Sequence, residues 1–275
     1  MAIHVRRVSY ALGAEVTGVD IRNPLDEKTF SEIHRAFLDH CVLLFRGQAL
    51  STDQHVALTR MFGETDKQGD APPDYPNPKY PEIEGVRNPN AGNAELSGKN
   101  AYAGEHWHSD FSFRLNPPAA SLLRAIDVPS VGGDTAFANM YLAYESLSDG
   151  MKRLIDGIHA VHVDGRTGRI RTAQPLVRTH PETGRKALFL GGESKRVHSF
   201  VGMTAEETKP LFEFLCQHAT RPQFCYRHAW QRDDLVIWDN RCTLHQAVGD
   251  YDRMQQRNLE RTAVVGEPSG YTYEG

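Results

Sequence analysis

The feature that most restricts the fold is a long series of short strand-like segments in the second part of the chain. Each segment is rich in apolar and β-branched residues, and turn signals such as Gly132-Gly133-Asp134 separate it from the next. Two helices interrupt the series, one over about Tyr141–Ile155 with a break near Ser148, the other from a capping box at Thr204–Glu207 to about His218. Because strands and helices do not alternate strictly, we expect a mainly β fold with flanking helices, a sandwich or barrel. The predicted strands are Trp107–Phe113, Ala120–Ile126, Thr135–Ala138, Ala160–Val163, Leu176–Thr179, Ala187–Leu190, Phe224–His228, Leu235–Trp238 and Leu259–Val265.

The first part of the chain combines strands and helices. Cys41–Phe45 is a continuous apolar run, which is typical of a strand covered on both faces. Apolar residues at helical spacing predict a helix over Glu27–Asp39, and the capping box Ser51–Gln54 predicts a second helix towards Met61. We also expect a short strand over Ile3–Val8 and a turn over Gly13–Gly18.

Between these two parts the periodic pattern disappears, because six of the 15 prolines lie between Gly63 and Glu105 together with Gly and Asn. A loop of this length inside a compact domain is usually a lid or a binding loop. Periodic sequence borders it on both sides. We therefore expect a single domain over residues 1–275, with a long active-site loop at about 63–106.

The composition excludes several classes of protein. The 31 basic and 35 acidic residues are nearly balanced, which argues against bulk electrostatic binding to nucleic acid or to an anionic membrane. Cys41–Phe45 is too short to span a bilayer, and Glu15 and Asp20 interrupt any signal peptide after Arg6-Arg7, so we expect a cytoplasmic location. The four cysteines are scattered without a Cys-x-x-Cys pair, so a metal would be bound by carboxylates and some of the 13 histidines.

The sequence His106-Trp107-His108-Ser109-Asp110 follows the irregular segment directly. On a strand, residues i and i+2 point to the same face, so His106, His108 and Asp110 would project together. These side chains are either half of a metal site or a hydrogen-bonded group of ordinary residues. As a metal site they partly match a His-x-His-x-Asp-His hydrolase, although Phe111 replaces the last histidine, and they match a cupin poorly. They also fit a facial triad of His-x-Asp and one distant histidine, which leaves three positions of a ferrous ion open.

A candidate for the distant histidine is His245, which follows the predicted strand Leu235–Trp238 and a polar corner. The alternative is a hydrogen-bonded loop histidine. Further on, period-two alternation places Arg257, Leu259 and Arg261 on one face of a strand. Two arginines beside an apolar residue favour an anion-binding pocket over a solvated edge, because the planar guanidinium matches a carboxylate bidentately.

These residues belong to a longer set of segments that resembles a known family. The segments are Val42–Gly47, Trp107–Asp110, Pro117–Ala119, Gly132–Thr135, Val177–Gly184, Trp238–Cys242 and the series His245, Arg257, Arg261. In order and spacing the chain, from about Gly13 to Pro268, resembles the taurine/2,4-dichlorophenoxyacetate (TauD/TfdA) family of Fe(II)- and 2-oxoglutarate-dependent dioxygenases. The resemblance implies a jelly-roll fold, the double-stranded β-helix. It also implies Fe(II) as cofactor, with 2-oxoglutarate and O2 as cosubstrates.

The resemblance also implies roles for individual residues. His108, Asp110 and His245 would be the catalytic iron ligands, whereas His106 would have no ligand role. Thr135 and Arg257 would bind the distal carboxylate of 2-oxoglutarate. Arg261 would reach the anionic group of the primary substrate or assist the cosubstrate, and Phe111 would line the substrate pocket. Iron with Asp110 carries one positive charge, 2-oxoglutarate makes it one negative, and Arg257 brings it to zero, which leaves Arg261 for an anionic substrate.

The expected reaction is hydroxylation of a small anionic organic molecule, with release of succinate and CO2. The substrate classes are sulfonates, sulfate esters, aryloxyalkanoates and other carboxylates. Taurine itself fits poorly, because Gly69–Asn100 contains no histidine and Gly104 stands where taurine-specific members carry an asparagine. Arg166, Arg169 and Arg171 form either an anion-reading rim or a solvated basic loop.

Two alternative functions remain open from the sequence: a metal-dependent hydrolase and a non-catalytic jelly-roll protein that binds small molecules. The only partners expected are the small-molecule substrate and further copies of the chain, in a homo-oligomer that is a dimer or tetramer. Neither nucleic acid nor a membrane is expected to bind.

Overall fold

The largest of the four sheets in the described residues, called the larger sheet below, contains seven strands in the order β1-β2-β3-β13-β5-β15-β4. A computed structural model describes residues 3–67, 79–87, 104–164, 171–192, 196–252 and 254–274. In this sheet β2 and β3 run parallel, and the other neighbouring strands are antiparallel. The strands are β1 (His4–Arg7), β2 (Ala14–Thr17), β3 (Val42–Phe45), β13 (Leu235–Asp239), β5 (Ala120–Asp127), β15 (Asn258–Val264) and β4 (Glu84–Arg87).

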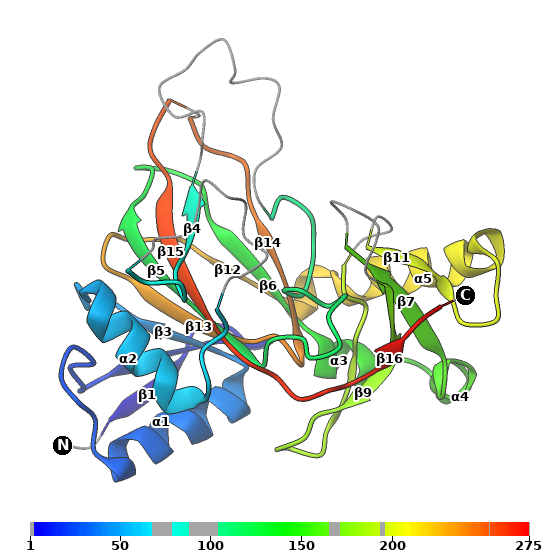
Figure 1. The fold of residues 1–275 in the computed structure, drawn as a ribbon. Coiled ribbons are helices and arrows are strands. Elements are labelled where there is room, and N and C mark those ends of the chain that lie inside the picture. The colour runs from blue at the N-terminus through cyan, green and yellow to red at the C-terminus, as the bar shows by residue number, and fades with distance from the viewer. Residues whose placement is uncertain are drawn as a thin grey trace.

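Three smaller sheets complete the β structure (Figure 1). Their orders are β12-β6-β14, β11-β7-β8-β16 and β10-β9. The first contains β12 (Cys225–His228), β6 (Thr135–Asn139) and β14 (Thr243–Ala247). The others contain β11 (Val197–Phe200), β7 (His159–Val163), β8 (Arg171–Pro175), β16 (Tyr271–Thr272), β10 (Lys186–Leu188) and β9 (Val177–Thr179). The predicted mainly β, jelly-roll fold is confirmed.

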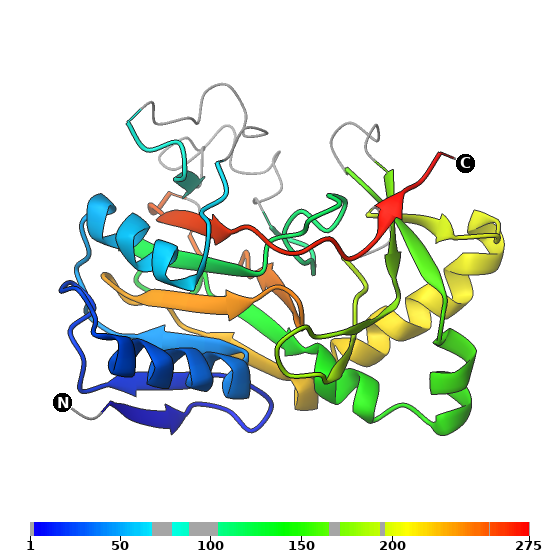
Figure 2. The ribbon, with the colours of Figure 1, turned by 60° about the horizontal axis from the view of Figure 1, so that its bottom comes forward.

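Two helices, α1 (Glu27–His40) and α2 (Thr52–Phe62), cover one face of the larger sheet (Figure 2). Asp26 caps α1, and Ser51 forms the predicted capping box of α2 with Gln54. Ile33 and Phe37 of α1 are buried against the sheet, as their helical spacing predicts. This packing forms the first of two hydrophobic cores.

Alternate residues of the central strands point into two different cores. In β3, Leu43 and Phe45 face the core beneath α1 and α2, whereas Val42 and Leu44 face the core that the larger sheet shares with β6 and β14. This division explains why the strand is continuously apolar. Leu259 of β15 also faces the second core, so the residues two positions before and after it point towards the space between the sheets.

The remaining helices pack at the far end of the molecule from the amino terminus (Figure 2). The predicted break at Ser148 is confirmed, because Ser148 caps α4 (Asp149–Ile155), which follows α3 (Met140–Glu145). The second capping box, Thr204 with Glu207, opens α5 (Ala205–Ala219), and a short 3-10 turn η1 (Pro222–Phe224) follows it. No helix in the described ranges is long and apolar enough to cross a membrane.

Several local predictions were wrong or incomplete. The segment Gly13–Gly18 is not a turn, because Ala14 and Val16 are buried in β2, between two glycines with positive φ. The segment Trp107–Phe113 is not a strand, since only His108 forms a β-bridge and Asp110–Phe113 form turns. Within the expected loop 63–106, β4 pairs with β15. Residues 68–78 and 88–103 of that loop, like Arg166 and Arg169, lie outside the described residues.

Candidate active site

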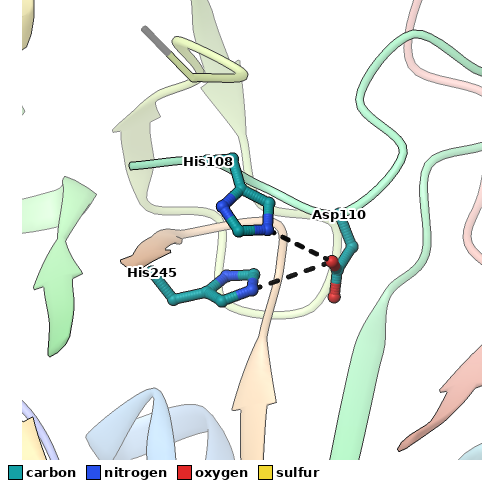
Figure 3. A group of neighbouring side chains, drawn as sticks. All are labelled: His108, Asp110 and His245. Atoms are coloured by element: carbon teal, nitrogen blue, oxygen red, sulfur yellow. Dashed lines mark ion pairs between the residues drawn. The ribbon is translucent and has the colours of Figure 1, made fainter. Parts of the chain in front are cut away.

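Two histidines and one aspartate converge between the sheets (Figure 3). Nε2 of His108 lies 3.8 Å from Oδ1 of Asp110, and Nε2 of His245 lies 3.7 Å from the same oxygen. All three side chains are buried, and their ligand atoms lie within 4.8 Å of one another. The structure therefore brings His245 beside His108 and Asp110, which lie far from it in the sequence, as the sequence predicts.

The backbone holds the two histidines together. The amide of His108 donates to the carbonyl of His245 at 2.9 Å, and the amide of His245 donates back at 2.8 Å. This reciprocal pair places the two imidazole rings 4.1 Å apart, between their centroids, on one side of the bridge. The approach of His108 and Asp110 therefore comes from a bridge and a turn, and not from the predicted strand.

Hydrogen bonds also fix the Asp110 carboxylate. Ser121 of β5 donates to its Oδ2 at 2.7 Å, and Asn240 donates to Ser121 at 2.9 Å. Trp238 in turn donates to Asn240 at 2.9 Å and packs 4.7 Å from the ring of His245. One chain of contacts thus sets the position of the carboxylate and of a histidine facing it.

The protonation states of the group suit a divalent cation. Nδ1 of His108 lies 2.7 Å from the carbonyl of His106, and a proton on Nδ1 leaves Nε2 with a lone pair facing Asp110. Burial lowers the pKa of His108, and burial lowers the pKa of His245 to about 4, so both imidazoles are neutral. Burial alone would raise the pKa of Asp110, but Arg261 and the two histidines lower it more strongly. Two neutral imidazoles and one carboxylate form the donor set of a non-haem ferrous site.

Thr135 and Arg257 lie side by side, although 122 positions separate them. Arg257 donates through Nε to the carbonyl of Gly133 at 2.8 Å and through Nη2 to Oγ1 of Thr135 at 3.4 Å. The indole of Trp230 donates to the same hydroxyl at 3.0 Å. Both Thr135 and Arg257 are buried. The pair offers a cation and a hydroxyl side by side, which suits a carboxylate ligand.

Arg261 is buried in β15, two positions after the buried Leu259, as the period-two alternation predicts. Its Nη1 contacts Oδ1 of Asp110, and its Nε donates to Oε2 of Glu84 at 3.1 Å. The charge count made from the sequence was therefore wrong in one respect, because Arg261 has a second carboxylate partner, Glu84, besides Asp110. No local signal indicated Glu84, since it lies within the segment predicted to be irregular.

Phe111 lies beside Arg261, with the guanidinium carbon 5.3 Å from the ring centroid. Arg114 lies 4.0 Å from the same ring. Phe111 has a φ of 43°, in the left-handed region that is costly for a residue with a large side chain. The strained backbone next to Asp110 turns the ring towards the arginines.

Comparison with known proteins identifies the family of this chain. Residues 4–263 match the model of the family described as "Taurine catabolism dioxygenase TauD, TfdA family". The chain belongs to the TauD/TfdA family. It is thus a 2-oxoglutarate-dependent non-haem iron dioxygenase, an enzyme that requires Fe(II), 2-oxoglutarate and O2.

Individual relatives agree with this assignment. The chain is 33% identical to an alkylsulfatase of Acinetobacter baylyi, with 96% of this chain and 86% of the relative covered. It is 35% identical to the alpha-ketoglutarate-dependent 2,4-dichlorophenoxyacetate dioxygenase of Cupriavidus pinatubonensis, over 92% and 94% of the two chains. Among solved structures, a taurine dioxygenase from Burkholderia xenovorans superposes with a TM-score of 0.86, at 35% identity, over 100% of this chain and 96% of the other.

Two further motifs of the TauD/TfdA resemblance meet at the corner between β13 and β14. Asp239 pairs with Arg241 at 2.7 Å and with His180 at 3.0 Å, and Arg241 also pairs with Glu182 at 2.6 Å. His180, Asp239 and Cys242 could be taken for a second metal group. However, both oxygens of Asp239 are already bonded to Arg241, and burial raises the pKa of the Cys242 thiol, so this group is an ion-pair network. It holds the corner that leads into His245.

Two residues near the site were missed in the sequence analysis. The side chain of Arg196 passes beside Gly192, where an added Cβ would lie 2.7 Å from its Cδ and 3.4 Å from Cβ of His108. His162 is fully buried, stacked on Phe189, and neither ring nitrogen has a hydrogen-bond partner among the described residues. His162 lies next to Gly191 and Arg196 next to Gly192, and only the tertiary fold brings them towards His108.

Proposed function

We propose that this dioxygenase hydroxylates a small anionic organic substrate, with release of succinate and CO2. The observation that carries the proposal is the buried His108, Asp110 and His245 group, whose aspartate contacts Arg261 of β15. A second buried arginine, Arg257, lies directly before that strand. The proposed substrate classes are sulfonates, sulfate esters, aryloxyalkanoates and other carboxylates. The names of the relatives, an alkylsulfatase and a 2,4-dichlorophenoxyacetate dioxygenase among them, support this range.

In this proposal His108, Asp110 and His245 hold Fe(II). Bound iron supplies the redox chemistry that couples the decarboxylation of 2-oxoglutarate by O2 to hydroxylation of the substrate. The protein keeps both imidazoles neutral and the carboxylate ionised, so that binding of the metal displaces no proton from them near neutral pH. Ser121 and the His106 carbonyl fix the orientation of two of the three ligands.

Thr135 and Arg257 bind the distal carboxylate of 2-oxoglutarate in this proposal. Burial removes most competing water from the pair, and a buried guanidinium binds a carboxylate more strongly than an exposed one does. Arg261 contacts the anionic group of the primary substrate, and the Phe111 ring forms an apolar wall beside it.

The structure also bears on the choice among substrates and alternatives. Gly104 packs against His108, because a Cβ added there would lie 3.1 Å from Cε1 of the ring. Position 104 is a glycine that leaves little room for a side chain beside the His108 ring, so no side chain from this position contacts the substrate. This supports a substrate other than taurine. The hydrolase alternative requires another ligand beside Asp110, but among the described residues the group has three members and position 111 is Phe.

Location and assembly are further parts of the proposal. All four cysteines are free thiols, which suits a reducing compartment and supports a cytoplasmic location. The dimer or tetramer expected from the sequence stays a prediction, which sedimentation of the purified enzyme would test. The long loop at 63–106 is proposed to border the active site, and Glu84 of β4 is the described residue of it that reaches Arg261.

The decisive experiment is anaerobic addition of Fe(II) and 2-oxoglutarate to the metal-free protein. We expect a visible charge-transfer band in the wild type and its loss in His108→Ala, while His198→Ala, a change at an exposed histidine, retains it. Release of succinate over a panel of sulfonates, sulfate esters and carboxylates then identifies the substrate class. Absence of the band in the wild type, or a band that persists in His108→Ala, would contradict the ligand assignment. Failure of every anion to stimulate succinate release would contradict the substrate class alone.

A further inference from the structure

Glu84 and Arg261 form a pair across two neighbouring strands of the larger sheet. The antiparallel register of β4 and β15 places Arg261 directly opposite Glu84, so both side chains project from the same face. Nε of Arg261 donates to Oε2 of Glu84 at 3.1 Å, and Nη2 contacts the same oxygen. The backbone register therefore places a carboxylate beside the arginine that is proposed to bind the substrate.

The two sides of the guanidinium face different groups. Its Nε and Nη2 atoms are taken by Glu84, whereas Nη1 points to Asp110 and so to the proposed metal site. The Glu84 side chain is 23% exposed, while that of Arg261 is 10% exposed. Glu84 thus orients Arg261 and compensates its charge from the outer side, leaving Nη1 directed inward.

This pairing changes the charge balance of the pocket. Fe(II), Asp110, 2-oxoglutarate and Arg257 sum to zero, and Arg261 with Glu84 also sums to zero. A monoanionic substrate therefore adds one negative charge to this set, and a dianion adds two. Each of these charges would share the Arg261 guanidinium with the Glu84 carboxylate, in a partly buried site where repulsion between like charges is weakly screened.

We infer that Glu84 is a specificity-determining residue, which makes the site select monoanionic substrates over dianionic ones of the same shape. The inference rests on the proposed function, because it takes Arg261 as the residue that binds the substrate's anionic group. It gives β4 a role in discriminating between substrates of different charge.

The test compares the binding of two probes that differ in charge but little in shape, hexyl sulfate and hexyl phosphate, at pH 8. Binding is measured by anaerobic calorimetry on the enzyme loaded with Fe(II) and 2-oxoglutarate. We expect the wild type to bind the sulfate more tightly. In Glu84→Gln, the affinity for the phosphate should rise about tenfold more than that for the sulfate, since one nearby negative charge is removed.

Glu260→Gln is the matched control. Glu260 is the neighbour of Arg261 on β15, but its carboxylate pairs with Arg124 at 3.0 Å on the opposite face of the sheet. Its replacement should leave the preference between the two probes unchanged. If Glu84→Gln weakens both probes equally, Glu84 only positions Arg261 and the inference is overturned.

An unchanged preference between the two probes in Glu84→Gln would also overturn the inference about Glu84. So would a wild type that shows the charge-transfer band but binds neither probe. Absence of the band in the wild type would instead refute the proposed function. The two failures are therefore distinguishable.

Discussion

The buried His162 imidazole should make the stability of the protein fall as the solution becomes acidic. The ring is fully buried against Phe189, without a hydrogen-bond partner among the described residues. Burial, together with the nearby charge of Arg196, lowers the pKa of His162 from 6.5 to about 3. The folded state therefore keeps this imidazole neutral, whereas the unfolded chain takes up a proton below pH 6.5. The contribution to stability is complete above pH 6.5 and decreases as the pH falls towards 3.

The magnitude follows from the two pKa values. Each pH unit between them costs about 1.4 kcal/mol of unfolding free energy for one proton. Between pH 7 and pH 5, His162 alone should reduce the free energy of unfolding by about 2 kcal/mol. A neutral side chain at this position removes that loss. In His162→Leu, which has a similar volume, the decrease between pH 7 and pH 5 should therefore be about 2 kcal/mol smaller than in the wild type.

The assay is urea unfolding of the metal-free protein at both pH values, followed by tryptophan fluorescence. His162→Gln provides a second neutral replacement in case leucine is too tightly packed against Gly191, where an added Cβ would already lie 2.2 Å from the His162 ring. His198→Leu, at an exposed position of β11, is the control and should behave as the wild type does. If both neutral variants lose as much free energy as the wild type between pH 7 and pH 5, the reasoning is refuted.

Two further predictions concern the cosubstrate and the corner before His245. Arg257→Ala should raise the dissociation constant of 2-oxoglutarate on the order of 100-fold, measured by anaerobic titration of the charge-transfer band, because a buried charged partner of the carboxylate is lost. Arg257→Lys should recover only part of that affinity, and an unchanged constant in Arg257→Ala would exclude the assigned role. Arg241→Ala should lower the free energy of unfolding by about 3 kcal/mol, measured by urea unfolding at pH 7, because it leaves Asp239 buried with His180 as its remaining ionic partner. A loss below about 1 kcal/mol would show that the network at this corner contributes little.

Much of the secondary structure could be predicted because its signals are local. The capping boxes at Ser51 and Thr204 and the apolar run Val42–Phe45 depend on a few adjacent residues, and the structure contains all three. The segment Trp107–Phe113 looked like a strand for the same local reasons. It is held instead by a single bridge to His245 and by a turn, which are set by contacts far along the chain.

The candidate active site likewise contains residues that local spacing predicts and contacts that depend on distant parts of the chain. His108 and Asp110 were recognised from their spacing, but the pairing of Thr135 with Arg257 across 122 positions came only from resemblance to a family. Glu84 was not identified at all. Its contact with Arg261 depends on the register of two strands 177 positions apart, and no pattern around residue 84 reports that register.

The position of β4 at the edge of the larger sheet has a consequence for how such an enzyme can acquire new substrates. The proposed iron ligands and both arginines belong to buried parts of the structure, whereas most of β4 is only partly buried and, among the described residues, pairs with one strand, β15. If Glu84 reads the charge of the substrate as proposed, a change of side chain on this strand alters the surroundings of the substrate while the interior packing is preserved. Libraries confined to residues 84–87 are therefore a direct way to change the substrate preference of the enzyme while its buried residues stay the same.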